Sequence, residues 1–307
     1  MDGFFSALSA SLVLLMLMSV GWMTAAEKRF LSKFIVNIAV PCNCVTGLLN
    51  NLDHDSLLQA GLMVVSAMVG VAVTLVLSLL LAKLLRLPRE RWGGFVAMAA
   101  FSNTLFIGLP VSTQLFGDVC VPYVMMYYLA NTLFVQSAGI LLIERSGTRA
   151  GKKTTVGGFF KDVFTKPPIL AVLFTVLLLV LDLRLPGPIM TWAGYISQSV
   201  SPMALIYCGY IVFELGLKNL RPMKGLPAMI LMRLGIAPVI CWFFCHLFGM
   251  SGLPLSVFVV ESALPVVSQV PVLAGAYGAD DQYAATGAVL STLCSFISIP
   301  ILMLILG

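Results

Sequence analysis

A stretch of polar and helix-breaking residues, SNTLFIGLP, lies inside the apolar run of residues 91–115. Asn103 and Thr104 supply hydrogen-bonding side chains, and Gly108 and Pro110 follow them. Glycine and proline both weaken a helix, and proline also removes a backbone donor. A break at membrane depth leaves backbone N–H and C=O groups free, which is tolerated only where they face protein or a watery cavity. The stretch therefore predicts an interrupted helix that could bind a polar ligand.

A second stretch, ESALPVVSQVP, has the same character inside the apolar run of residues 254–276. Pro271 follows Pro110 by 161 positions, and each proline precedes a valine and then an aromatic–glycine pair at the same spacing. One explanation is that these prolines are ordinary kinks, because Pro and Gly are frequent in membrane helices. The paired spacing favours two corresponding broken helices that cross near the middle of a membrane.

Two such breaks favour a small anion, because the N-terminus of a half-helix carries partial positive charge and free N–H groups. No Lys or Arg is expected at the midplane, so amides, hydroxyls and dipoles would hold a carboxylate there. The candidate substrate-binding residues are Asn103, Thr104, Gly108, Pro110, Pro265, Ser268, Gln269 and Pro271, with Asn37, Asn43 and Asn131 as additional candidates. For the last three asparagines, hydrogen bonding between helices is the alternative role.

Glu261 is an acid well inside an apolar run, and intramembrane acids are candidates for function. It precedes Pro265 by four residues, so helical spacing puts the two on a common side. Its carboxylate could take up H⁺ or hold Na⁺ and so couple transport to an ion gradient; the alternative is an acid near the outer end of its helix that reaches the interface. Arg233 is expected nearer the cytoplasmic side, with its head group at the interface.

Metal and cofactor chemistry have little support in the sequence. The two histidines, His54 and His246, are far apart, and the spacing of Cys42 and Cys44 matches no usual zinc or redox pattern. We therefore expect no cofactor and no metal, apart from a coupling ion.

The elements that position these residues follow from composition. Hydrophobic residues make up 60% of the 307 residues and charged residues 10%, whereas a soluble domain is about one-quarter charged. Apolar runs near the ~20 residues that a helix needs to cross a bilayer indicate an all-α polytopic membrane protein. The ten predicted spans are 4–22, 31–50, 57–83, 91–115, 119–143, 167–184, 189–215, 226–249, 254–276 and 283–306.

Charge sets the expected orientation. The loops on one side hold 17 of the 18 Lys and Arg residues, and the other side holds only Arg184. Positive loops face the cytoplasm, so both termini are expected outside and the basic loop 144–166 inside. The first run has no Lys or Arg before it, unlike a secretory signal, and is interpreted as a retained span.

The offset of 161 also relates Pro41 to Pro202 and aligns spans one to five with spans six to ten, the third only loosely. The chain would then consist of a first five-helix repeat at 1–143, the cytoplasmic loop at 144–166, and a second repeat at 167–307. Five spans is an odd number, so the second repeat must be inverted, as in many secondary transporters.

The motifs that carry these features resemble one family. SNTLFIGLPVSTQLFG and ALPVVSQVP…YG resemble the fourth-span and ninth-span signatures of the auxin efflux carriers, and VNIAVP and KPPILAVLF are similar to other parts of that family. The resemblance implies scaffold and transport domains, an elevator-type motion, and a carboxylate site lined by Asn103, Pro110, Pro265 and Pro271. The short central loop is similar to bacterial malonate-type members rather than to the plant auxin exporters.

The expected function is that of a secondary carrier for small organic anions, mono- or dicarboxylates, in the plasma (inner) membrane. Expected partners are the anion and the lipid bilayer, with a homodimer left open and no nucleic acid. The sequence contains no G-x-x-x-x-G-K-[ST] or H-E-x-x-H motif, so neither a self-contained ATP-driven pump nor an enzyme is expected. A membrane ligand sensor or receptor of the same fold and a channel are the alternatives.

Overall fold

The computed structural model is helical almost throughout the part of the chain that it describes. The described residues are 28–51, 57–148, 165, 167–200, 202–203, 206, 210, 213 and 223–306. The predicted first span, most of the central loop and much of the seventh span lie outside them, and the predicted repeat boundaries stay predictions.

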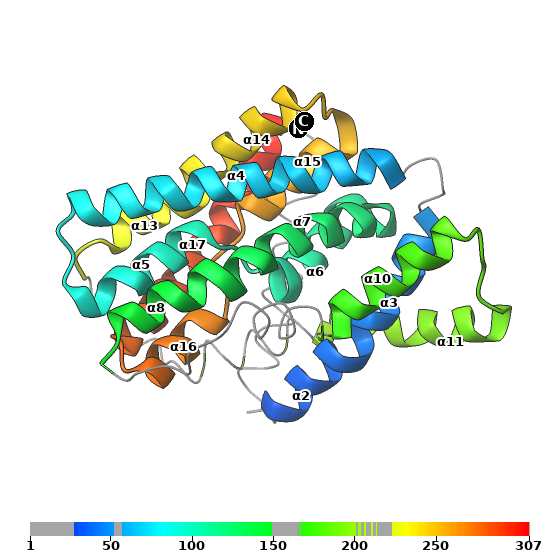
Figure 1. The fold of residues 1–307 in the computed structure, drawn as a ribbon, viewed down its shortest axis with the longest axis horizontal. Helices are drawn as coiled ribbons and strands as arrows, with labels where there is room; N and C mark the ends of the chain where they lie inside the picture. Colours follow the sequence, from blue (N-terminus) through cyan, green and yellow to red (C-terminus); the bar gives the residue numbers. More distant parts are fainter. Residues whose placement is uncertain are drawn as a thin grey trace.

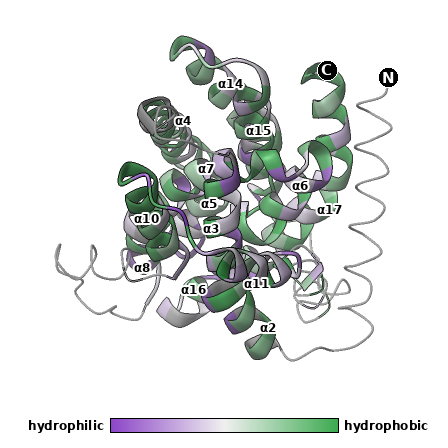
Figure 2. Cartoon of the chain, turned by 90° about the vertical axis from the view of Figure 1, so that its right-hand side faces the viewer, coloured by the Kyte–Doolittle hydropathy of each residue, from purple (hydrophilic) through white to green (hydrophobic). Residues whose placement is uncertain are grey.

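Long apolar helices dominate the described residues. Four of them are long and apolar enough to cross a bilayer, by length and composition: Gly61–Leu84, Asp118–Ser146, Leu226–Leu247 and Asp281–Leu306. The first lies in α4 (Leu57–Leu84) and the last is α17 (Asp281–Leu306). Large apolar side chains are exposed on α4, α14 (Ala237–Leu247) and α17, and Figure 2 shows hydrophobic colour along α14 and α17. Exposed apolar faces of this extent are typical of helices that contact lipid, and they indicate a membrane protein.

One group of helices lies on the right of Figure 1. A continuous helix formed by α2 (Lys28–Phe34), η1 (Ile35–Ala39) and α3 (Val40–Asn51) packs against α10 (Pro167–Val180) and α11 (Gly187–Ser197). A hydrophobic cluster that includes Ile35, Leu48 and Ile169 holds this group together.

Most of the other described helices surround a second hydrophobic cluster, built around Phe95, Met98 and Phe258. They comprise α4, α5 (Arg89–Ala100), α13 (Leu226–Leu231), η6 (Met232–Ile236), α14 (Ala237–Leu247), α15 (Gly252–Ser262), α16 (Gln269–Tyr277) and α17. The helix formed by α7 (Val121–Phe134), η4 (Val135–Gly139) and α8 (Ile140–Ser146) contributes side chains to both clusters. The two groups therefore meet along α7.

Two helices are interrupted where the sequence stretches above occur. After α5 the chain is extended at Phe101 and turns at Asn103, and it then forms η2 (Thr104–Gly108) and α6 (Leu109–Phe116). After α15 the chain leaves helical geometry until α16 begins.

The two interrupted helices differ in length. Gly117 and Gly278 follow the second halves with positive φ and are 161 positions apart, as the sequence offset requires. Asn103 and Ser268, which precede the second halves, are instead 165 positions apart. The second half of the later helix is therefore shorter by about one turn of ~3.6 residues, and a single offset does not align the two breaks.

Candidate functional site

The non-helical segment between α5 and η2 and the one between α15 and α16 run antiparallel to one another where they cross. They are called the two crossing chains below. Asn103 N–H donates to the carbonyl of Pro265 at 2.9 Å, and Val267 N–H donates to the carbonyl of Phe101 at 3.3 Å. These bonds enclose an isolated antiparallel bridge between Ser102 and Val266. Backbone groups released by the breaks must find partners at this depth, and each chain supplies some of the partners of the other.

Side chains from the following long helices complete the crossing. Asn131 of α7 donates its amide to the carbonyl of Ser102 at 2.9 Å and accepts from Ser102 N–H at 3.3 Å. On the other chain, Val266 N–H donates to Ser291 Oγ of α17 at 3.1 Å. Asn131 thus takes the place of the backbone partners that Ser102 would have in a continuous helix. This role goes beyond the hydrogen bonding between helices given above as the alternative. Sequence reasoning missed Ser291, because a serine in an apolar helix carries no distinguishing signal.

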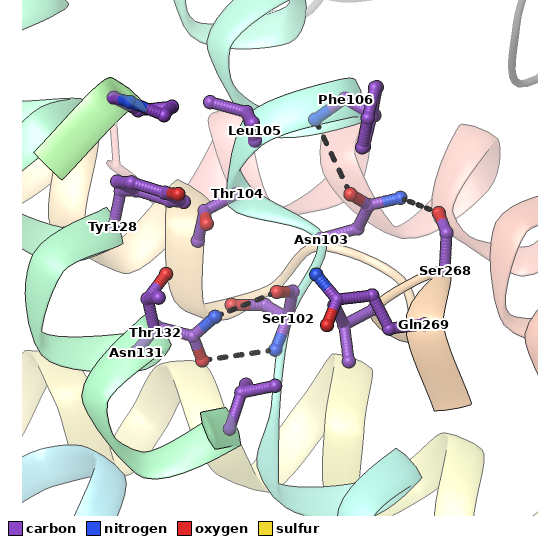
Figure 3. A pocket seen from close by; sticks show the side chains of 13 residues that line it. Ser102, Asn103, Thr104, Leu105, Phe106, Tyr128, Asn131, Thr132, Ser268 and Gln269 are labelled. Carbon is purple, nitrogen blue, oxygen red and sulfur yellow. Dashed lines mark hydrogen bonds between the residues drawn. The ribbon is translucent and has the colours of Figure 1, made fainter. Parts of the chain in front are cut away.

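Asn103 links the starts of the two second half-helices. Its Oδ1 accepts from Phe106 N–H at 3.4 Å, which caps η2, and its Nδ2 donates to Ser268 Oγ at 2.7 Å (Figure 3). Ser268 directly precedes α16. One amide therefore fixes the distance between the two helix N-termini.

A cavity of about 190 Å³ opens beside these N-termini (Figure 3). Its lining residues are Ser102, Asn103, Thr104, Leu105, Phe106, Tyr128, Asn131, Thr132, Val135, Pro168, Val267, Ser268 and Gln269. Tyr128 and Thr132 come from α7 and Pro168 from α10, so the cavity lies at the boundary between the two helix groups. Ser102 is 1% exposed, and its buried hydroxyl has no hydrogen-bond partner among the described residues. The lining thus offers hydroxyl and amide groups, one of them unpartnered, next to apolar walls.

The structure brings five predicted site residues to this cavity: Asn103, Thr104, Asn131, Ser268 and Gln269. Pro265 contributes its carbonyl to the crossing behind them. Pro110 is buried in the first turn of α6, and Pro271 is half-buried near the start of α16. None of these three prolines lines the cavity.

Two of the additional asparagines lie elsewhere. Asn37 is exposed on η1, and Asn43 Nδ2 donates to Ser197 Oγ of α11 at 2.8 Å. The bond of Asn43 joins α3 to α11 inside the first helix group, which is the interhelical role weighed as the alternative.

Glu261 is fully buried at the end of α15. Ser112 of α6 donates its hydroxyl to Oε1 at 2.7 Å, and Oε2 has no hydrogen-bond partner among the described residues. A side chain at Gly108 would overlap this carboxyl, so the glycine permits the close approach of η2 to Glu261. The structure therefore places the acid in the protein interior beside the crossing and not at an interface.

Arg233 corrects an expectation. Its side chain is 1% exposed, and its guanidinium donates to the carbonyls of Ala99, at 3.5 Å, and of Ser262. The expected interfacial position is wrong, because two backbone acceptors inside the protein replace the water that an arginine in an apolar helix would otherwise seek. Hydropathy carries no information about acceptors contributed by other helices.

Comparison with known proteins identifies membrane transporters as relatives of this chain. The sequence profile of a family described as membrane transport protein matches residues 6–303. An uncharacterized transporter of Methanocaldococcus jannaschii is 24% identical over 302 residues, which cover 94% of this chain and 95% of the relative. An uncharacterized transporter of Methanothermobacter thermautotrophicus is 26% identical over 277 residues, or 90% of this chain and 88% of the relative. The chain therefore belongs to the membrane transport protein family, the family of the auxin efflux carriers that its two broken-helix motifs resemble.

Proposed function

We propose that this transporter is a secondary carrier of small organic anions, mono- or dicarboxylates, across the plasma membrane, and that the cavity at the crossing binds the anion. The observation that carries the proposal is the convergence of two half-helix N-termini on one cavity, tied together by Asn103 and Ser268. Each N-terminus contributes a partial charge of roughly +0.5, and such ends bind anionic groups without a basic side chain.

The size and lining of the cavity suit a compact molecule. A volume of about 190 Å³ corresponds to roughly six water molecules at ~30 Å³ each. The Thr104 and Gln269 side chains, which line the cavity, are the proposed polar contacts to a carboxylate. Leu105, Phe106 and Val267 offer apolar contacts to the remainder of the molecule.

The proposed architecture has ten spans in two inverted repeats, 1–143 and 167–307, with both termini outside and the loop 144–166 in the cytoplasm. Two contacts support part of this arrangement. Arg91 Nε donates to Asp280 at 2.7 Å, and Thr148 N–H donates to the carbonyl of Gly278. These contacts join segments for which the inverted arrangement requires the same side of the membrane. Alternating access would move the second helix group against α2–α3, α10 and α11, because the cavity lies where the groups meet.

Glu261 is proposed to couple transport to H⁺ or Na⁺. Its buried carboxyl has one oxygen bonded to Ser112 and one without a partner among the described residues. An acid in this setting can accept a proton or contribute a ligand to a cation. It lies beside η2, so its occupancy could influence the half-helix that faces the substrate.

Uptake into proteoliposomes tests the proposal. A panel of radiolabelled mono- and dicarboxylates is offered under imposed pH and Na⁺ gradients, and we expect saturable uptake with counterflow for at least one of them. Asn103→Ala should abolish uptake. Asn43→Ala, which removes a side-chain hydrogen bond away from the cavity, should retain uptake. Binding without uptake would favour a sensor, and flux that neither saturates nor shows counterflow would favour a channel.

A further inference from the structure

The first halves of the two interrupted helices end in carbonyl groups that the crossing deprives of their usual partners. In an uninterrupted helix the carbonyl of Ala99 would accept from Asn103 N–H, four residues on. Asn103 N–H donates instead to Pro265. The carbonyl of Ser262 would likewise accept from Val266 N–H, which donates instead to Ser291. The crossing therefore leaves one carbonyl at the end of each first half-helix, that of Ala99 and that of Ser262, without its usual helical partner in the protein interior.

Arg233 supplies donors to these two carbonyls. One guanidinium nitrogen donates to Ala99 and the other to Ser262, and the side chain comes from a third helix, at η6. The Tyr127 side chain of α7 also interacts with this guanidinium. Glu261, the residue before Ser262, takes its hydrogen bond from Ser112. A planar guanidinium can reach two separate acceptors at once, which a lysine ammonium on a single nitrogen cannot do with the same geometry.

The charges also balance. The C-terminal end of each half-helix carries roughly −0.5 of an elementary charge, so two ends together offset about one positive charge. The opposite ends, the N-termini of η2–α6 and α16, face the cavity. Transporters with broken helices commonly place a small cation at such carbonyl ends. In this protein the Arg233 guanidinium lies at the carbonyl ends of the two first half-helices.

We propose that Arg233 is a tethered cation that joins the carbonyl ends of the two broken helices, and that it occupies the position where a mobile cation would otherwise bind. Arg233 is then a positioning residue, because it holds the two chains so that their N-termini converge on the cavity. Its importance for transport rests on the proposed function, whereas its role as a tethered cation does not. Any cation coupling would have to act at another place, of which Glu261 is the candidate.

Chemical rescue tests the proposal without a substrate. The purified full-length protein is compared with Arg233→Ala and with Arg91→Ala, which removes an arginine bound to a side chain, Asp280, rather than to helix ends. The melting temperature is measured in millimolar guanidinium chloride and in choline chloride at the same concentration. We expect Arg233→Ala to melt several degrees below the wild type in choline and to regain part of the loss, saturably, in guanidinium. The wild type and Arg91→Ala should gain nothing from guanidinium.

An identical response of all three proteins to the two salts would overturn the proposal, as would a melting temperature of Arg233→Ala in choline equal to that of the wild type. If Arg233→Ala yields no folded protein, Arg233→Lys decides, because it keeps the charge but presents its donors from one nitrogen and not from the two that reach Ala99 and Ser262. It should melt below the wild type, and an unchanged melting temperature would overturn the proposal. A wild type that transports no carboxylate would refute the proposed function and leave this test unaffected.

Discussion

Replacement of Gly108 by alanine would place a methyl group against the Glu261 carboxyl and the Leu264 side chain. Glu261 is fully buried and accepts a hydrogen bond from Ser112, so its carboxyl has little space into which it could move. Overpacking of a buried site of this kind costs about 1–3 kcal/mol, and loss of the hydrogen bond from Ser112 would add about 0.5–1.5 kcal/mol. We therefore expect Gly108→Ala to reduce stability by about 1–3 kcal/mol and to weaken the response of uptake to an ion gradient.

The matched control is Gly94→Ala in α5, where an added methyl group would meet no atom within 4 Å. Alanine there should be neutral or raise stability by up to ~1 kcal/mol, as in other helix interiors. Thermal unfolding in detergent measures both variants. The double variant Gly108→Ala/Glu261→Ala should lose less than the sum of the single variants, with a coupling of about 0.5–3 kcal/mol. Strict additivity, or a Gly108→Ala protein as stable as Gly94→Ala, would refute the close approach of η2 to Glu261.

The remaining predictions concern the crossing, the coupling and the orientation. Asn131→Ala should lower stability by about 1–3 kcal/mol because it leaves the buried Ser102 peptide without partners, and unfolding as stable as that of the wild type would contradict this role. Glu261→Gln should make uptake insensitive to imposed pH and Na⁺ gradients; a variant that still responds to them would remove Glu261 from the coupling. Cysteines introduced at Ala150 and His54 should be labelled by a membrane-impermeant maleimide from opposite faces, and labelling from the same face would overturn the proposed topology.

Several features of the site were predictable because they are local. Pro265 lies in the non-helical segment between α15 and α16 and so marks the second break, whereas Gly108 and Pro110 lie within η2 and α6, just beyond the first break. Asn103 and Ser268 lie within those breaks, and both face the cavity in the structure. Pro110 and Pro271 were placed in the site by the same reasoning, yet they lie in the helices beyond the cavity.

The sequence by itself determined the class of the protein, because long apolar runs with few charges can be accommodated only as helices in lipid, and it located the two interruptions. The tertiary structure decided which groups satisfy the interruptions. Asn131, Ser291 and Arg233 come from helices that are distant in the chain, and nothing in their own segments distinguishes a partner of the crossing from an ordinary polar residue. Hydropathy describes the surroundings that a segment prefers, whereas a hydrogen bond between segments depends on where two helices meet. For that reason Arg233 was expected at the interface and lies instead between two helix ends.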